Sequence, residues 1–279
     1  MKKLKIAFYK YHGTGNDFIL IDNRTIAWKP TQPQVALLCD RHLGIGADGL
    51  MLLNELPGFD FGMTYYNSDG LESTMCGNGG RCITAFAESL GILKKKSHFM
   101  AIDGDHVATI LSRHDHVTFV RLKMKDCSIG QEYPDGLFLD TGSPHFVKSV
   151  DNVQLFDVAA NGRALRYDSR FMPGGTNVNF VEKTDRGIYV RTYERGVEAE
   201  TLSCGTGVTA SAIAFAHLTR SKVNRVAINT PGGVLTVSFC QNNDLFTNIW
   251  LEGPATFVFS GVIDLNPDTS APLIFKPKR

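Results

Sequence analysis

The stretch Glu72-Ser73-Thr74-Met75-Cys76-Gly77-Asn78-Gly79-Gly80-Arg81 places a cysteine at the start of a glycine-rich turn, and an apolar, helix-like run follows it. A second stretch, Glu200-Thr201-Leu202-Ser203-Cys204-Gly205-Thr206-Gly207, has the same arrangement. In both, Cys-Gly-x-Gly opens the helical run, and a glutamate stands four residues before the cysteine. Two such motifs in matching contexts indicate that the chain contains a duplicated unit.

The elements around the two motifs recur in the same order after roughly 125 residues, which is too long for a solenoid repeat and suits a duplicated domain. Asn16 precedes Cys76 by about as many residues as His145 precedes Cys204. Each half is predicted to hold many short strands and one long apolar helix, and a helix that is apolar on most faces must be buried.

We therefore expect an α+β protein of two pseudo-symmetric domains, each a curled, mostly antiparallel sheet or barrel around a central helix. The domains are expected at 1–128 and 129–262, with the tail 263–279 returning to the first. Periodicity and turn residues predict the individual elements. The predicted helices are 33–43, 82–90, 153–160 and 208–218, and the predicted closing strands include 246–252 and 255–262.

The bulk composition is that of an ordinary globular protein, with 43% hydrophobic and 20% charged residues among 279. A formal net charge of +1 gives no electrostatic case for a nucleic-acid or membrane partner. No apolar run approaches the ~20 residues that span a bilayer, and the N-terminus does not resemble a signal peptide, so we expect a cytoplasmic protein. The six cysteines include no CxxC and are not grouped with histidines at ligand spacing, so no metal site is expected.

A thiol at a helix N-terminus lies at the positive end of the helix dipole, which lowers its pKa and favours the thiolate. The glycines leave backbone N–H groups open to an anion such as a carboxylate, and Asn78 and Thr206 can add side-chain contacts. A single motif would also fit a covalent nucleophile or a redox thiol. Two motifs, one in each half, favour a cleft between the domains with a thiol on each wall.

Two facing thiols suit the removal of a proton from one face of a carbon and its replacement on the other face, with one cysteine as base and the other as acid. That reaction is the racemisation or epimerisation of an amino acid at its α-carbon. No lysine stands in a recognisable site for pyridoxal phosphate, so no cofactor is expected. Helix-end N–H groups would then stabilise the enolate-like carboxylate as it develops.

Six stretches together resemble the diaminopimelate epimerase family, in the right order and over nearly the whole chain. The resemblance implies the pseudo-symmetric two-domain fold and the cofactor-independent interconversion of LL- and meso-2,6-diaminopimelate, a step toward lysine and peptidoglycan precursors. It also implies that Cys76 and Cys204 are the acid–base pair. The stretches are His12-Gly13-Thr14-Gly15-Asn16-Asp17-Phe18, Gly44-Ile45-Gly46-Ala47-Asp48-Gly49, Tyr66-Asn67-Ser68-Asp69-Gly70, Met75-Cys76-Gly77-Asn78-Gly79-Gly80-Arg81-Cys82, Tyr193-Glu194-Arg195-Gly196 and Ser203-Cys204-Gly205-Thr206-Gly207.

The resemblance also implies which residues bind the substrate and which tune the thiols. A substrate with two amino acid ends needs partners for the carboxylate and ammonium of the non-reacting end, which Arg195, Glu194 and asparagine amides can supply. Supporting roles fall to His145, Glu72 and Glu194. Ser143 departs from the family pattern, which usually has Asn-Pro-His where this chain has Ser-Pro-His. The implied substrate contacts are Asn16, Asn67, Gly77, Asn78, Asn177, Glu194, Arg195, Gly205 and Thr206.

Two other function classes stay open at this point. One is another isomerase of the same fold, such as a proline or hydroxyproline racemase or a phenazine-biosynthesis isomerase. Proline racemases tend to have histidine after Met-Cys-Gly, where this chain has Asn78. The other is a non-enzymatic binding module. The expected partner is a small-molecule substrate, and a homodimer is possible.

Overall fold

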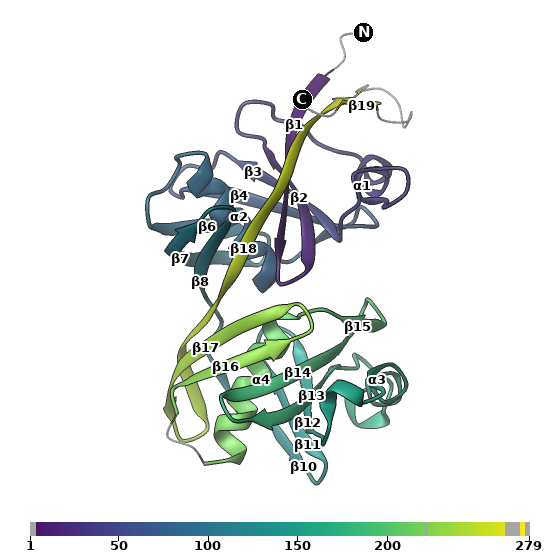
Figure 1. Cartoon of the computed structure of the whole chain (residues 1–279), viewed down its shortest axis with the longest axis vertical. Helices are drawn as coiled ribbons and strands as arrows, with labels where there is room; N and C mark the ends of the chain where they lie inside the picture. The colour runs from purple at the N-terminus through teal and green to yellow at the C-terminus, as the bar shows by residue number, and fades with distance from the viewer. Residues whose placement is uncertain (1–3, 221–222, 266–273, 277–279) are drawn as a thin grey trace. The chain divides into compact units, whose positions relative to one another are not determined.

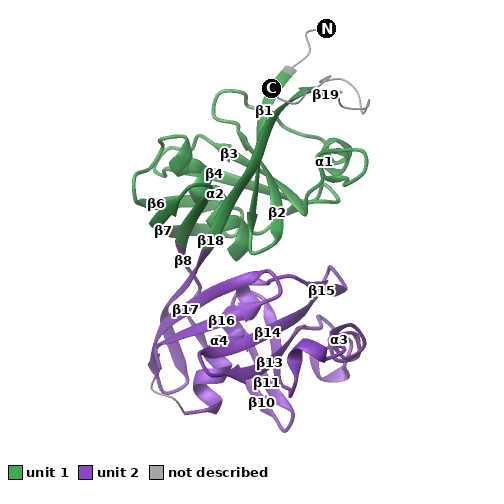
Figure 2. Ribbon diagram, in the orientation of Figure 1, with its two compact units in different colours: residues 1–120, 254–279 green, residues 121–253 purple. Residues whose placement is uncertain are grey.

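The computed structural model describes residues 4–220, 223–265 and 274–276, and the chain divides into two compact units (Figure 2). Unit 1 contains the residues up to Val120 and those from Pro254 onward, and unit 2 runs from Arg121 to Gly253. Both of these boundaries come earlier in the chain than the expected boundaries at 128 and 262. The parts of the expected tail at 266–273 and 277–279 lie outside the described residues.

In unit 1 the strands pair in the order β18–β1–β2–β3–β4–β6–β7, and β8 pairs with β18. Most of these pairs are antiparallel, but β2 with β3 and β4 with β6 are parallel. The strands are β1 (Leu4–Gly13), β2 (Asn16–Asp22), β3 (Gly49–Asn54), β4 (Phe61–Asn67), β5 (Glu72–Ser73), β6 (Lys96–Ala101), β7 (Gly104–His114), β8 (Val117–Lys123), β18 (Leu245–Leu265) and β19 (Ile274–Lys276).

Unit 2 repeats this pattern of pairings. Its strands pair as β10–β11–β12–β13–β14–β16–β17–β18, with β12 and β13 parallel and β14 and β16 parallel. The short strand β9 pairs with β18. The strands are β9 (Cys127–Ser128), β10 (Gln131–Tyr133), β11 (Gly136–Asp140), β12 (Pro144–Ser149), β13 (Asn177–Thr184), β14 (Gly187–Glu194), β15 (Ala199–Thr201), β16 (Arg225–Thr230) and β17 (Gly233–Asn242).

Each sheet curls around one buried helix, α2 (Gly77–Ser89) in unit 1 and α4 (Gly205–Leu218) in unit 2 (Figure 1). Every residue of α2 from Gly77 to Ala87 is buried, as expected for a helix that is enclosed by strands. The helix ends at Ser89, and two residues later Gly91 adopts a positive φ of 74° and donates its N–H to Glu88 O. These features confirm the expected fold class of a strand-rich protein with a central helix in each half.

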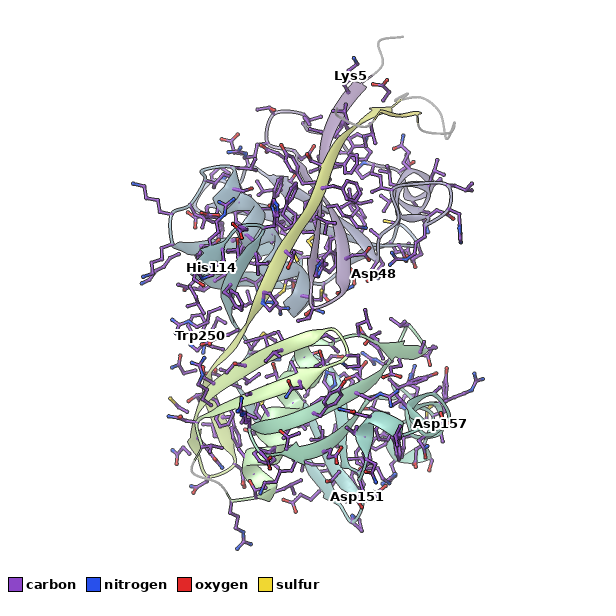
Figure 3. The ribbon with its side chains drawn as sticks, in the orientation of Figure 1. Lys5, Asp48, His114, Asp151, Asp157 and Trp250 are labelled. Carbon is purple, nitrogen blue, oxygen red and sulfur yellow. The ribbon has the colours of Figure 1, made fainter. Side chains whose placement is uncertain are left out.

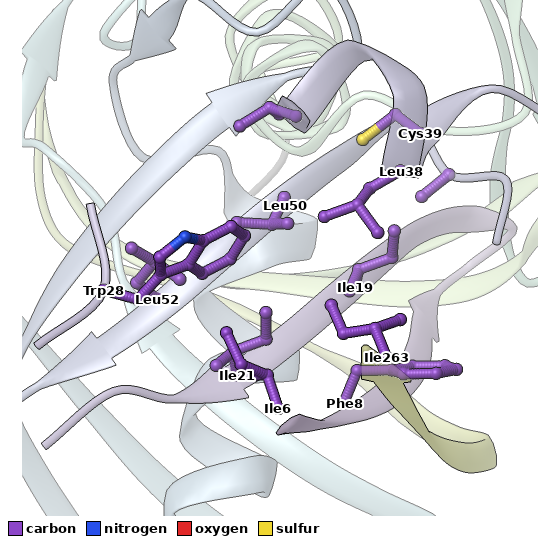
Figure 4. Close-up of a cluster of buried hydrophobic side chains, with 12 residues drawn as sticks. Ile6, Phe8, Ile19, Ile21, Trp28, Leu38, Cys39, Leu50, Leu52 and Ile263 are labelled. Carbon is purple, nitrogen blue, oxygen red and sulfur yellow. The ribbon is translucent and has the colours of Figure 1, made fainter. Parts of the chain in front are cut away.

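Each unit also has its own hydrophobic core outside the central helix. In unit 1, the strands β1, β2 and β3 pack apolar side chains against α1 (Gln32–Cys39) and Trp28 (Figure 4). In unit 2, an aromatic cluster that includes Phe146, Phe171 and Phe180 packs beside α3 (Val158–Arg166). Burial of aromatic side chains of this size contributes much of the stability of such a core.

Several predicted elements differ from the structure. The helix predicted at 33–43 ends at Cys39, where Asp40 adopts an extended conformation, and the helix predicted from 208 begins at Gly205, directly after its N-cap residue Cys204. The helix predicted at 153–160 is a short 3-10 turn, Val153–Leu155, followed by α3, because Asp157 caps a new helix by accepting from Ala160 N at 3.0 Å. The helix predicted from residue 82 begins at Gly77, since Cys76 is its N-cap. The two predicted closing strands are one continuous strand, β18, which pairs with β17 in unit 2 and with β1 in unit 1.

In the described part of the chain, none of the helices combines the length and the apolar character that a membrane crossing requires.

Candidate active site

Cys76 is the N-cap residue of α2, and its sulfur is held at the helix mouth. The backbone is extended there, with φ −104° and ψ 151°, and the Sγ atom accepts a hydrogen bond from Gly79 N at 3.2 Å. The Cys76 side chain thus takes the place that Ser, Thr or Asp fills at most helix starts. The backbone N–H groups of the first turn and the helix dipole both favour negative charge on this sulfur.

Asn16, at the start of β2, lies against the Cys76 thiol. Its Oδ1 atom is 3.9 Å from Cys76 Sγ and accepts from Asn78 Nδ2 at 3.3 Å. The Nδ2 atom of Asn16 donates to Asp48 Oδ2 at 2.6 Å, so a carboxylate fixes which way the amide points. Asp48, labelled in Figure 3, comes from the loop before β3.

Asp17 extends this polar cluster beneath Asn16. It forms ion pairs with Lys10 at 2.7 Å and with Arg41 at 2.8 Å. Burial of Asp17 opposes its ionisation, but hydrogen bonds from Arg41 and Lys10 outweigh that effect and hold the pKa of the carboxyl well below its usual range. Asp17 is therefore ionised near neutral pH, and its ion pairs anchor the turn that presents Asn16.

Arg81 lies on α2 one turn behind the thiol, and its side chain is fully buried. The guanidinium donates to Gly77 O at 3.1 Å, to Asn78 Oδ1 at 3.0 Å and to Thr14 Oγ1 at 3.3 Å. It also donates to Pro254 O at 3.3 Å. The side chain therefore ties the helix mouth to the β1–β2 turn and to β18.

Cys204 is the corresponding N-cap residue of α4 in unit 2, and it is buried. Its Sγ atom lies 3.5 Å from Thr206 Oγ1, and that hydroxyl is 2.9 Å from His145 Nε2. Asn179 Nδ2 lies 3.0 Å from His145 Nδ1 on the opposite side of the ring. A buried polar chain thus connects the Cys204 thiol to β13.

The contacts of His145 assign its tautomer and its charge. An amide N–H from Asn179 faces Nδ1, so Nδ1 is the acceptor, and Nε2 carries the proton and donates to Thr206. Burial, and in second place the charge of Arg195, lowers the pKa of His145 to about 3. The imidazole is therefore neutral near pH 7, and it orients the Thr206 hydroxyl beside the sulfur.

Asn177, Glu194 and Arg195 gather where β13 and β14 come together. The Arg195 backbone N–H donates to Asn177 Oδ1 at 2.8 Å, and the Arg195 guanidinium donates to Gly174 O at 3.2 Å. Glu194 Oε2 accepts from Thr201 at 3.0 Å. Asn177 Nδ2 donates to Ser143 Oγ at 2.9 Å, so the predicted unit 2 residues form one connected group.

Strand register identifies the residues of the two units that correspond. Phe18 pairs with Gly49 across the parallel strands of unit 1, as His145 pairs with Asn177 in unit 2. His145 therefore corresponds to Phe18, whereas the spacing to the cysteines had suggested Asn16. Ser143 stands two residues before His145, and Asn16 stands two residues before Phe18, so Ser143 corresponds to Asn16. Ser143, which stands where the family usually has asparagine, is thus the unit 2 counterpart of Asn16, the asparagine that contacts Cys76.

The structure does not bring two of the predicted residues into these clusters. Glu72 is exposed in β5, where its backbone pairs with Tyr66, and no described contact joins its side chain to Cys76. Asn67 is exposed at the end of β4, where its backbone N–H donates to Leu71 O at 2.9 Å. The register matches Asn67 with Glu194, because Tyr66 faces Glu72 as Tyr193 faces Glu200.

The sequence did not predict several residues of these clusters, among them Asp48, Arg81 and Asn179. Asp48 and Arg81 stand inside stretches that carry the family resemblance, but their side-chain partners are distant in sequence. Asn179 had a local signal, because it follows Asn177 at a two-residue interval and stands between the apolar residues Val178 and Phe180. Residues spaced in this way point to the same face of a strand.

Known proteins resemble this chain in sequence over most of its length. A sequence model of the family described as diaminopimelate epimerase matches residues 8–126 and 137–258. A diaminopimelate epimerase of Flavobacterium psychrophilum is 52% identical over 257 residues, which cover 91% of this chain and 99% of the relative. The corresponding enzyme of Chlorobaculum tepidum is 42% identical over 265 residues, with 91% of this chain and 99% of the relative covered.

Several solved structures share this fold but carry names that differ from diaminopimelate epimerase. A phenazine biosynthesis protein of the PhzF family from Bacillus anthracis superposes with a TM-score of 0.73 at 15% identity, covering 95% of this chain and 100% of that one. A probable proline racemase from Agrobacterium radiobacter K84 has a TM-score of 0.66 at 17% identity, with 94% of each chain covered. At such identities the likeness shows a shared fold.

The fold and the paired thiol-capped helices define an isomerase of the racemase and epimerase class. Within that class, the chain belongs to the diaminopimelate epimerase family. This confirms the expected family. The curated relatives do not favour the proline racemase alternative.

Proposed function

We propose that this chain interconverts LL- and meso-2,6-diaminopimelate by proton exchange at one α-carbon, with Cys76 and Cys204 as the acid–base pair. The observation that carries the proposal is the recurrence of a thiol as the N-cap residue of the central helix in both units. A nucleophile or a redox thiol needs only one such position, whereas inversion at a carbon needs two proton-transferring groups on opposite faces.

The proposed reaction is a two-base transfer. One cysteine, as thiolate, removes the α-hydrogen from one face of the carbon and becomes a thiol. The other, as a thiol, gives its proton to the opposite face and becomes a thiolate. In the reverse direction the two roles exchange, so every proton is accounted for and no redox change occurs.

The planar carbanion intermediate is stabilised through the carboxylate of the reacting end. The helix starts at Gly77 and Gly205 present backbone N–H groups, and Asn78 and Thr206 add side-chain donors. These groups act on negative charge as it moves from the α-carbon into the carboxylate. Neutral His145 supports this step by orienting Thr206.

The non-reacting end of the substrate provides specificity. Arg195 and the amides of Asn16, Asn67 and Asn177 suit a carboxylate, and Glu194 suits an ammonium group. Ser143, held by Asn177, takes part in this set in place of the usual asparagine. A substrate with a single amino acid end would leave these groups without partners.

Incubation with meso-diaminopimelate in deuterated water tests the proposal. Wild type is expected to incorporate deuterium at the α-carbon and to form the LL isomer, as followed by NMR and chiral chromatography. Cys76→Ala and Cys204→Ala are each expected to lose epimerisation by at least about a thousandfold. Full epimerisation by either variant would refute the two-thiol mechanism, and turnover of proline instead of diaminopimelate would refute the substrate assignment.

The pathway and the assembly state complete the proposal. The reaction serves lysine and peptidoglycan precursor synthesis, which is why we place the protein in the cytoplasm, and we propose that it acts as a homodimer. Light scattering on the purified protein at micromolar concentration measures the assembly state directly, and a monomeric mass at full activity would contradict the dimer.

A further inference from the structure

Arg81 is a fully buried cation whose hydrogen-bond partners are all uncharged. Its guanidinium contacts two backbone carbonyls, those of Gly77 and Pro254, and the side-chain oxygens of Asn78 and Thr14. Among the ion pairs formed by residues 4–220, 223–265 and 274–276, none includes Arg81. A buried charge without a counter-charge is costly, so its presence in the first helical turn needs an explanation.

Two thiols lie next to Arg81 along α2. Cys82 follows it in the chain, and Cys76 directly precedes Gly77, whose carbonyl accepts from the Arg81 guanidinium at 3.1 Å; both thiols interact electrostatically with Arg81. Cys82 is fully buried in α2, and that burial raises the pKa of its thiol far above the usual value, so it stays protonated. Cys76 is only partly buried and accepts a backbone N–H at the helix mouth. Of the two sulfurs, Cys76 is therefore the one that can carry the balancing negative charge.

Most of the other titratable groups on the elements that pack against α2 are paired or neutral. Asp22 pairs with Arg24, and Asp105 and His106 pair with His98 and Asp103. Lys10 and Asp17 pair with each other, and Arg113 pairs with Glu88 at the far end of the helix. Burial lowers the pKa of His12 and raises that of Tyr11, which keeps both uncharged near pH 7. These groups lie on β1, β2, β7 and α2, and β3 contributes no titratable side chain.

We propose that Arg81 is the fixed counter-cation of the Cys76 thiolate, so that Cys76, and not Cys204, is the ionised cysteine of the resting enzyme. Arg81 is a positioning residue that acts through Cys76, and the inference rests on the proposed function of that thiol. Gly79 N and the helix dipole act in the same direction as Arg81. Asn16 Oδ1 opposes them, but it is a neutral oxygen 3.9 Å from the sulfur.

Unit 2 has no cation at the equivalent position. The helices α2 and α4 both start one residue after their cysteine, so the fifth residue of each helix corresponds: Arg81 in α2 and Thr209 in α4. The Thr209 hydroxyl donates to Gly205 O at 2.8 Å, a neutral contact. Cys204 is connected through the Thr206 hydroxyl to His145, and the imidazole of His145 is uncharged. The pseudo-symmetry is thus broken in charge at this position.

The rate of alkylation by iodoacetamide, measured separately at Cys76 and Cys204 by peptide mass spectrometry from pH 5 to 10, tests the proposal in the intact protein without substrate. In wild type, Cys76 is expected to react as a thiolate at lower pH than Cys204. Equal profiles, or a more acidic Cys204, would overturn the proposal. This comparison needs no variant, so it stands even if replacement of Arg81 prevents folding.

Variants of Arg81 then assign the effect to its charge. Arg81→Gln is expected to slow alkylation of Cys76 at pH 7 by about tenfold or more, because one unit of pKa is a tenfold change in thiolate fraction, and to leave Cys204 unchanged. Arg81→Lys retains the charge and is expected to keep the Cys76 profile close to that of wild type. A purely structural role for Arg81 predicts that lysine and glutamine are equally disruptive.

Arg113→Gln is the matched control, because Arg113 is an exposed cation beside the opposite end of α2. Its profile is expected to equal that of wild type. A folded Arg81→Gln protein with an unchanged Cys76 profile would refute the proposal. Because alkylation requires no turnover, this outcome is distinct from a failure of wild type to epimerise diaminopimelate, which would refute the function itself.

Discussion

At the scale of single residues, two thiols in corresponding positions have different surroundings. Cys76 accepts from Gly79 N and lies near the buried Arg81, whereas Cys204 lies beside a hydroxyl that neutral His145 orients. An epimerase that works in both directions needs one thiolate and one thiol at the start of each turnover. In our proposal, the difference in charge between the two surroundings sets that starting state.

The lowered pKa of His145 makes the free energy of unfolding depend on pH, and a variant without this side chain measures its contribution. Burial, and next the charge of Arg195, lowers its native pKa to about 3, whereas the unfolded chain titrates near 6.5. Between these values the unfolded state binds one more proton than the native state, so stability falls as pH falls through this window, by up to about 1.4 kcal/mol per pH unit.

Urea unfolding at pH 7, 6 and 5 measures this effect. The variant His145→Gln lacks the titrating group, so its stability is expected to decline less steeply than that of wild type, by about 1 kcal/mol between pH 6 and pH 5. His114→Gln, at an exposed histidine of β7, is the control and should retain the wild-type slope. Parallel slopes for wild type and His145→Gln would show that the native ring binds protons as readily as the unfolded chain does, and would contradict the lowered pKa.

At the scale of elements, the helix mouths depend on close approach between the first helical turn and a strand. A Cβ atom built at Gly207 would overlap Asn179 Oδ1 and would lie 3.3 Å from His145 Cε1. A Cβ atom at Gly79 would overlap the Cε atom of Met51, which ends a flexible side chain, and would lie 3.3 Å from Cys76 Sγ. The two glycines thus have different neighbours although the motifs are alike.

Gly207→Ala is expected to destabilise the protein by roughly 2 kcal/mol, although alanine is ordinarily about 1 kcal/mol better than glycine inside a helix. The reason is that Asn179 is held by Thr192 and by His145 and cannot move away. Calorimetry should show a Tm lower by about 4–8 °C.

Gly79→Ala is the matched comparison, and the flexible Met51 should reduce its cost to under about 1 kcal/mol. A Gly207→Ala protein as stable as wild type would contradict the packing described for Asn179.

At the scale of the whole molecule, each unit has its own core and its own central helix. Residues of unit 1 come from both ends of the chain, because β18 leaves unit 2 at Gly253 and pairs with β1 (Figure 2). The proposed acid–base pair has one cysteine in each unit, so both units must be folded for the proposed reaction. Because the cores are separate, we expect a destabilising substitution in one unit to lower the stability of that unit more than that of the other.

Phe180→Ala is expected to destabilise unit 2 by about 3–5 kcal/mol, since this fully buried ring packs 4.7 Å from Phe156. Native-state hydrogen exchange should then rise in β13 and β14 and stay low in β1 and β2. Phe61→Ala in unit 1, where the ring stacks on Phe99 at 4.9 Å, should show the reverse pattern. An equal loss of protection in both units would mean that they unfold as one cooperative body.

The sequence by itself determined the duplication, the strand-rich units with a central helix, the two helix-opening cysteines and the family. These features are written in short-range periodicity and in contiguous motifs, because helix capping and strand alternation involve neighbouring residues. Helix ends were less well predicted: α2 starts five residues before the expected position, because a cysteine serves as its N-cap.

Only the tertiary structure decided how the two thiols differ. Asp48 orients Asn16 from 32 residues away, Arg81 reaches Thr14 across 67, and Asn179 selects the tautomer of His145 across 34. Strand pairing and the packing of each central helix against its sheet brought these partners together, and strand register matched Ser143 with Asn16. Burial then determined the charges, because the same arginine or histidine side chain behaves differently in a dry interior than in water.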